Sequence, residues 1–165
     1  MMPLLHAARM LVLMALGACS AEKQAFDRHL AQLRPDTVTA LPYMGWPAGT
    51  MLCPLFLYQS ALAGSVPLAG RVNAFLKKKQ FLGGEDWSLI VVRPLPAGEA
   101  GIEQLFFKRA DYDVLNDPQR IGRDVEKVPA GFAPQTCVTV EQARVLVTRE
   151  QRAHRKLIIF GTALT

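Results

Sequence analysis

Histidine and cysteine are scarce in this chain, which has three of each among its 165 residues. None stands at the spacing of a metal-ligand motif and there is no CxxC pair, so we expect neither a metal centre nor a thiol redox site. The GxSxG, HExxH, P-loop and GxGxxG patterns are also missing, which removes common signatures of hydrolases and nucleotide-binding enzymes. Asp111 and Asp113 could flank a sugar as catalytic carboxylates, but beside Lys108 and Arg109 we expect surface ion pairs. The sequence therefore favours a protein that is not an enzyme.

The apolar run at the start of the chain is too short to cross a bilayer as a helix, which takes about 20 residues. It covers Met10–Leu16, follows the single positive charge of Arg9, and leads into Leu16-Gly17-Ala18-Cys19. A charged start, a short apolar middle and small residues at a cleavage site are typical of a secretory signal. The four last residues resemble the lipobox of bacterial lipoproteins. That resemblance implies cleavage before Cys19, a diacylglycerol on its thiol and an acyl chain on the new amino terminus; the alternative is an ordinary signal peptide with a chance cysteine.

The same resemblance predicts the destination of the protein. In such lipoproteins an Asp after the cysteine favours the inner membrane, whereas this chain has Ser20. We therefore expect an outer-membrane protein whose body faces the periplasm. Two or more acyl chains hold a protein stably at a membrane. Apart from this covalent lipid on Cys19, we expect no cofactor.

The remaining composition predicts one globular domain. Residues 1–18 form the expected signal peptide, residues 19–50 an acylated tether with a short helix and an irregular linker, and residues 51–165 a β-rich domain. The whole chain is 50% hydrophobic and 20% charged, which is typical of a folded protein. Arg9 is the one Lys or Arg of the signal, so 18 basic residues face 14 acidic ones after cleavage. This mild positive charge, outside the cytoplasm, points away from nucleic acid and toward anionic envelope components or an acidic partner.

Two cysteines remain once Cys19 is assigned to the lipid. Cys53 and Cys137 form an even pair in a compartment that is oxidising, so we expect a disulfide between them. Its loop of about 85 residues would stabilise the fold by roughly 4 kcal/mol on the chain-entropy model. The alternative is two buried free thiols, because cysteine packs readily in a core.

Local patterns predict a short helix followed by strands. Residues 21–33 place Phe26, Leu30 and Leu33 on one helical face. The following segment 35–50 is rich in Pro and Gly, which indicates an irregular linker or a wrap over the domain. Tyr43 and Trp46 within it are expected either to be packed or to form an exposed aromatic pair. Strands are expected at 51–58, 86–93, 102–108 and 136–140, and 144–148 and 156–160 look like the two arms of a hairpin. Residues 70–76 fit either a strand or a helix, and 110–115 fit a helical turn. This order predicts a mainly β fold, either a β-sandwich or a small barrel with a short N-terminal helix.

Two clusters of positive charge stand out. Lys77, Lys78 and Lys79 are consecutive and read as the solvated end of an element, or as a contact for anionic lipid or peptidoglycan. The turn of the last hairpin carries Arg149, Arg152, Arg155 and Lys156, with Glu150 as an acid among them. Cations so close repel one another unless acids or a partner offset them. We therefore expect this basic tip to be exposed and to help dock an acidic partner.

A family resemblance covers residues 86–163. Leu89-Ile-Val-Val-Arg93 is similar to a Val-rich strand ending in Arg of the TssJ family, the lipoproteins of the type VI secretion membrane complex. The segment Phe107-Lys-Arg-Ala-Asp111-Tyr112-Asp-Val-Leu115 is similar to the part that follows, and residues 145–148 and 157–163 are similar to two later strands. A second register places residues 67–77 on a Pro- and Arg-containing strand of the family.

The resemblance implies a transthyretin-like β-sandwich and a partner. In this family the loop after the Val-rich strand contributes to binding a large inner-membrane subunit, TssM, through its periplasmic domain. Carried over to this chain, the loop consists of Pro94, Leu95, Pro96, Ala97, Gly98, Glu99, Ala100 and Gly101. The expected function is therefore a lipid-anchored assembly subunit of an envelope-spanning complex. The alternative is a periplasmic lipoprotein that binds an apolar molecule or an envelope polymer in a small barrel; an envelope hydrolase is a more distant possibility.

Overall fold

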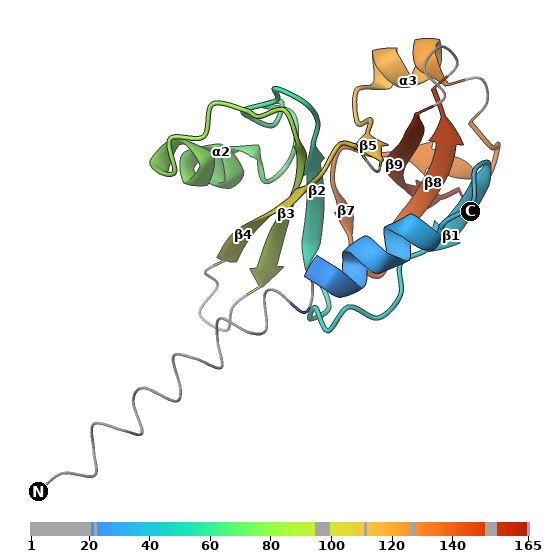
Figure 1. The fold of residues 1–165 in the computed structure, drawn as a ribbon. Coiled ribbons are helices and arrows are strands. Elements are labelled where there is room, and N and C mark those ends of the chain that lie inside the picture. Colours follow the sequence, from blue (N-terminus) through green and yellow to red (C-terminus); the bar gives the residue numbers. More distant parts are fainter. Residues whose placement is uncertain are drawn as a thin grey trace, which may run out of the picture.

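The computed structural model describes residue 21 and residues 23–94, 100–110, 112–125, 128–150 and 155–164. Their strands form two separate sheets (Figure 1). In the first sheet the order is β1 (Thr37–Ala40), β8 (Arg144–Arg149), β9 (Lys156–Ala163) and β5 (Asp113–Val114), with β6 (Phe132–Pro134) also paired to β9. In the second sheet the order is β4 (Ala100–Phe107), β3 (Trp87–Pro94), β2 (Met51–Leu55) and β7 (Val138–Thr139).

The fold is mainly β, as the sequence predicts. All described strand pairs are antiparallel except β5 with β9, which is parallel. In the described part of the chain both sheets are open and no strand pairs across from one to the other, so the arrangement is that of a β-sandwich and not of a closed barrel. The expected hairpin of β8 and β9 is confirmed, with Arg149 opposite Lys156.

The N-terminal helix (residues 23–32) completes the core between the two sheets. Its Phe26 and Leu30 are fully buried, and Leu33 just after it is 9% exposed, which confirms the predicted apolar face. The ring of Phe26 lies 5.6 Å from that of Phe107 of β4 and 6.3 Å from that of Phe160 of β9. The helix therefore ties the two sheets together, and its burial is part of what stabilises the fold.

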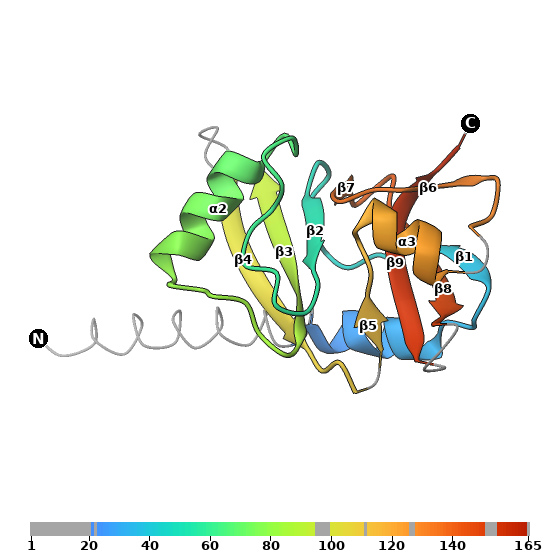
Figure 2. The ribbon, with the colours of Figure 1, turned by 90° about the horizontal axis from the view of Figure 1, so that it is seen from above.

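Each sheet is also covered on its outer face by a helix. Val72 and Leu76 of α2 (Ala69–Lys78) pack against Ile90 and Val92 of β3, and Ile121 of α3 (Pro118–Asp124) packs in a cluster with side chains of β8 and β9. Figure 2 shows these helices on opposite sides of the molecule. Because both faces of the central strands are buried, those strands contain continuous apolar runs, as residues 89–92 of β3 show.

Several elements differ from the expectation, and each has a physical reason. The segment 35–50 contains β1, which is held by pairing with the distant β8. Trp46 is buried, but Tyr43 is 92% exposed, so the two do not form a packed pair. Residues 69–78 are the helix α2, so the register that made this segment a strand is wrong. The helical turn expected at 110–115 is wrong for the strand β5, which lies within that segment, because Asp113 and Val114 pair with Leu157 and Ile158 of β9.

Candidate functional site

The predicted lipid-attachment residue, Cys19, lies outside the described residues. A described residue close to it in the sequence is Lys23, at the start of the N-terminal helix. Its Nζ lies 4.9 Å from the centre of the Phe107 ring and 3.8 Å from Oδ2 of Asp27. The chain therefore enters the domain beside the end of β4, and Cys19 precedes Lys23 by four residues in the sequence.

The predicted partner-binding loop is attached to the opposite end of the β3–β4 hairpin. The register runs from Trp87 opposite Phe107 at one end to Pro94 opposite Ala100 at the other. Seven residues of strand separate these ends, which is about 23 Å. The expectation that the loop joins two strands is confirmed, but Pro94, Ala100 and Gly101 are strand residues. Leu95, Pro96, Ala97, Gly98 and Glu99 lie outside the described residues.

The base of this loop is held by an ion pair across the hairpin. Nη1 of Arg93 lies 2.8 Å from Oε2 of Glu103, and both side chains are only about one-quarter exposed. Through this ion pair, the structure gives Arg93 a positioning role in the hairpin. Pro94 itself is exposed. The loop is thus carried by a firmly paired hairpin.

The basic tip of the second hairpin is more engaged with the domain than expected. Lys156 Nζ donates to the carbonyl oxygens of Leu30 and Ala31, at 3.1 and 3.2 Å, in the last turn of the N-terminal helix. Arg155 lies 3.6 Å from Asp113, which also accepts a 2.6 Å bond from Nε of Arg109. These partners offset the positive charge within the protein, so Arg155 and Lys156 have structural roles.

The rest of the tip fits the expectation only in part. Arg149 is exposed, and the backbone N–H of Glu150 donates to the carbonyl oxygen of Arg155. Arg152 lies outside the described residues. Burial lowers the pKa of Lys156 from its ordinary value, in keeping with a side chain drawn against the helix. Asp113 does pair with Arg109 and Arg155, but it is a buried residue of β5 and not part of a surface turn, and Asp111 lies outside the described residues.

A surface cleft of about 680 Å³ lies between the N-terminal helix and the start of β9. It is lined by Gln24, Asp27, Arg28, Ala31, Tyr112 and Lys156. The hydroxyl of Tyr112 donates to Oδ1 of Asp27 within it. Among the residues the structure describes, no group of three His, Cys, Asp or Glu gathers anywhere to hold a metal ion. The cleft is polar and open to solvent. It therefore differs from the apolar barrel interior that the alternative function, binding of an apolar molecule, would need.

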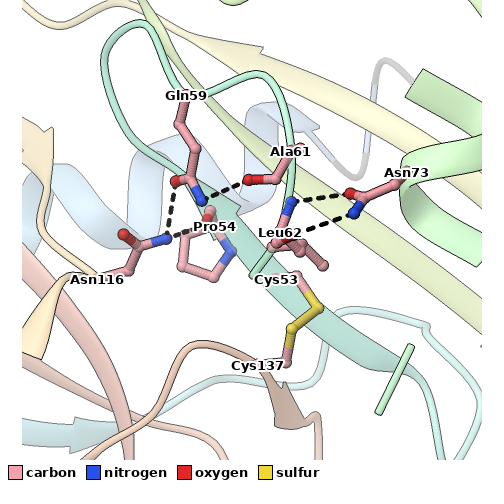
Figure 3. Close-up of a disulfide and its surroundings, with 8 residues drawn as sticks. All are labelled: Cys53, Pro54, Gln59, Ala61, Leu62, Asn73, Asn116 and Cys137. Carbon is pink, nitrogen blue, oxygen red and sulfur yellow. Dashed lines mark hydrogen bonds between the residues drawn. A yellow bond between two sulfur atoms is a disulfide. The ribbon is translucent and has the colours of Figure 1, made fainter. Parts of the chain in front are cut away.

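The predicted disulfide is present, joining Cys53 to Cys137 (Figure 3). Leu52 of β2 pairs with Val138 of β7, and the two cysteines occupy the next position along these strands. The bridge therefore continues the ladder where β7 has ended. Cys53 is fully buried, among the side chains that pack between α2 and the second sheet.

Side-chain amides complete the backbone bonding beside the disulfide. Pro54 follows Cys53, and its carbonyl oxygen accepts a 2.5 Å bond from Nδ2 of the buried Asn116 (Figure 3). The same nitrogen lies 3.1 Å from Oε1 of Gln59. Pro54 has no N–H to donate, and beyond the end of β7 none is required on this side of β2. This explains how a proline fits within the strand β2.

Comparisons with family models, with curated proteins and with solved structures found no match to this chain. In the described part of the chain, no helix has the length and apolar character needed to cross a bilayer.

Proposed function

We propose that this protein is a lipid-anchored, non-enzymatic subunit of an envelope-spanning complex, held at the outer membrane and facing the periplasm. One observation carries the proposal: the chain enters the domain beside Phe107, at one end of the β3–β4 hairpin, and the candidate loop leaves from Pro94 at the other end. An anchor at the first end directs the second end away from the membrane. A partner in the periplasm would then meet the loop first.

The packing of the domain supports a scaffold. Trp87 and Phe107 stack with ring centres 4.3 Å apart and are almost fully buried, and Phe26 fills the space beside them. A rigid hairpin lowers the entropy lost when a loop becomes ordered on binding. A ligand-binding lipoprotein is the alternative, but a core filled in this way favours a scaffold over an apolar pocket between the sheets.

The resemblance to the TssJ family supports a specific partner. It points to a type VI secretion membrane complex, in which the partner would be the periplasmic domain of a TssM-like inner-membrane protein. The loop 95–99 contains Pro96 and Gly98 and one acid, Glu99. Few side chains there have many rotamers to lose, so binding would rest on shape and on backbone hydrogen bonds.

The proposal is tested by replacing residues 95–99 with a Gly-Ser segment of equal length. The acylated protein is isolated from detergent-solubilised membranes of its own bacterium, and the co-purified proteins are identified by mass spectrometry. We expect the variant to keep its melting temperature and to lose an inner-membrane protein with a large periplasmic domain. Tyr43→Ser, which changes a 92% exposed side chain elsewhere, is the control and should retain that protein. Equal capture by both variants would remove the loop from the proposed function.

A further inference from the structure

An exposed apolar corner lies where α2 is joined to β3. It consists of Tyr58, Phe81, Leu82 and Phe106. Leu82 is 90% exposed, Tyr58 66% and Phe106 48%. The core under α2 includes Phe81 at its margin, so the corner continues that core to the surface, where the helix has ended. Large apolar side chains gathered in this way on a surface mark an interaction site.

The members of the apolar corner are neighbours in space. The rings of Phe81 and Phe106 lie 6.1 Å apart. The N–H of Tyr58 donates to the carbonyl oxygen of Gly84 at 2.9 Å, which places Tyr58 beside the chain that carries Leu82. Gly83 has a φ of +88°, and a Cβ at that residue would lie 2.6 Å from the backbone carbonyl oxygen of Tyr58. Only glycine allows this close approach, so the backbone holds Tyr58 and Leu82 together.

Positive charge flanks the apolar corner. Lys77 and Lys78 end α2, Lys79 follows, and all three are exposed. Lys79 lies 4.7 Å over the ring of Phe75, and in the described part of the chain neither Lys77 nor Lys78 forms an ion pair. The two acids that follow, Glu85 and Asp86, are exposed as well, and Asp86 accepts a bond from the backbone of Arg109.

The apolar corner shares an end of the second sheet with the start of the described chain. Phe106 of the corner precedes Phe107, whose ring lies under Lys23. Figure 2 shows the segment from α2 to β3 and the start of the N-terminal helix toward the same lower side, and the ends of β3 and β4 nearest Pro94 and Ala100 on the upper side. A membrane that holds the anchor can therefore also reach the corner.

We propose that the apolar corner and Lys77–Lys79 contact a bilayer that bears anionic headgroups. This inference rests on the lipid anchoring proposed above. Leu, Phe and Tyr side chains enter the boundary between headgroups and acyl chains, while adjacent lysines attract anionic lipid. The corner gives the anchored protein a second membrane contact and so fixes the domain's orientation, with Pro94 pointing away from the bilayer. Lys77 and Lys78, which have no ion pair in the described part of the chain, and the position beside the anchor favour lipid over a protein partner.

The test uses the acylated protein in vesicles and a tryptophan at the corner. Leu82→Trp is compared with Leu164→Trp, which places the same reporter at a 57% exposed site near the other end of the molecule. The native Trp46 and Trp87 are buried and give the same background in both. Vesicles of phosphatidylcholine with phosphatidylglycerol contain brominated lipid as a quencher. We expect strong quenching in Leu82→Trp and the background level in Leu164→Trp.

A second variant tests the lysines. Lys77, Lys78 and Lys79 are changed to Gln in the Leu82→Trp protein. The equilibrium constant for insertion of the tryptophan into the bilayer should fall by about fivefold for each lysine removed. The same fall should follow if the anionic lipid is omitted.

The outcomes separate the two proposals. Flotation with vesicles reports the anchor, whereas quenching reports the apolar corner. A protein that floats but shows equal, background quenching in Leu82→Trp and Leu164→Trp overturns the inference and leaves the anchor standing. A protein that does not float overturns both. Protection of the corner tryptophan by a protein partner, with no quenching by lipid, assigns the surface to that partner and also overturns the inference.

Discussion

Gly161 shows how closely strands approach in this domain. It lies in β9 opposite Pro134 of β6. A Cβ at this position would overlap the carbonyl oxygen of Ala133 and lie 2.5 Å from Cζ of Phe132. The contact is with backbone and with a buried ring, so neither neighbour can move away without disturbing β6.

We therefore expect Gly161→Ala to destabilise the protein by about 1–3 kcal/mol, the usual cost of overpacking. Chemical unfolding measures it. Gly122→Ala is the matched control, because a Cβ there meets no atom within 4 Å and the residue lies in α3, where Ala is favoured over Gly. Equal stability of the two variants would show that β6 does not approach β9 as described.

His29 makes stability depend on pH. Its Nε2 is buried and has no hydrogen-bond partner among the described residues, and burial lowers its pKa from the ordinary value of 6.5. Between the lowered pKa and 6.5 the unfolded chain binds more protons than the folded one, so stability rises with pH across that window and is lost as pH falls through it. We expect the melting temperature to fall on acidification, and to fall less in His29→Gln. His154→Gln is the control and should keep the wild-type dependence; identical profiles of all three proteins would contradict the assignment.

At the scale of elements, the disulfide fastens the short strand β7 to β2. Only Met51 and Leu52 of β2 pair with β7, and so short a ladder contributes little alone. Replacing Cys53 and Cys137 together by Ala should lower the free energy of unfolding by about 4 kcal/mol, because the bridge closes a long loop. Non-reducing peptide mapping should find the linked pair in wild type. Reductant should destabilise the wild type and leave the stability of the double variant unchanged. An equal effect of reductant on both proteins would show that the disulfide is not what stabilises the wild type.

The elements differ in how far their sequence predicts them. The central strands and the N-terminal helix are predictable because burial requires apolar side chains at a regular spacing, and that spacing is visible in the sequence, as Phe26 and Leu30 show. The helix α3 has a local signal that the prediction passed over: Asp117 accepts from the N–H groups of Gln119 and Arg120, and Pro118 opens the helix. By contrast, β1 alternates between partly buried and exposed residues and exists through its pairing with β8. No local pattern could reveal such a distant partner.

The candidate site follows the same division. The hairpin that carries the loop was predictable from two apolar runs with a Pro- and Gly-rich segment between them. The role of Lys156 was not, because its bonds reach carbonyl oxygens 126 and 125 residues earlier in the chain. The apolar corner was missed for a similar reason. Tyr58, Leu82 and Phe106 come from three segments, and only the fold brings them together.

At the scale of the whole molecule, the central prediction is acylation of Cys19. Cys19→Ser should abolish the lipid, and the protein should remain unprocessed or become soluble in the periplasm, because acyl chains supply the stable membrane attachment in this proposal. Fractionation of outer membrane, inner membrane and periplasm measures the outcome, and Ser20→Ala, which leaves the thiol in place, is the control. Outer-membrane levels equal to wild type in Cys19→Ser would contradict the anchor.

The burial of the N-terminal helix against Phe160 has a consequence for translocation. The N-terminal helix, at the start of the described chain, packs against β9, which lies near its end. The strand β1 cannot pair until β8 is available. Contacts between the two ends of a chain form slowly, because a long loop must close before they stabilise anything. A chain that crosses a membrane amino terminus first therefore remains unfolded until nearly all of it has emerged. In the export proposed above, this topology would keep the chain threadable and delay folding until the domain is in its final compartment.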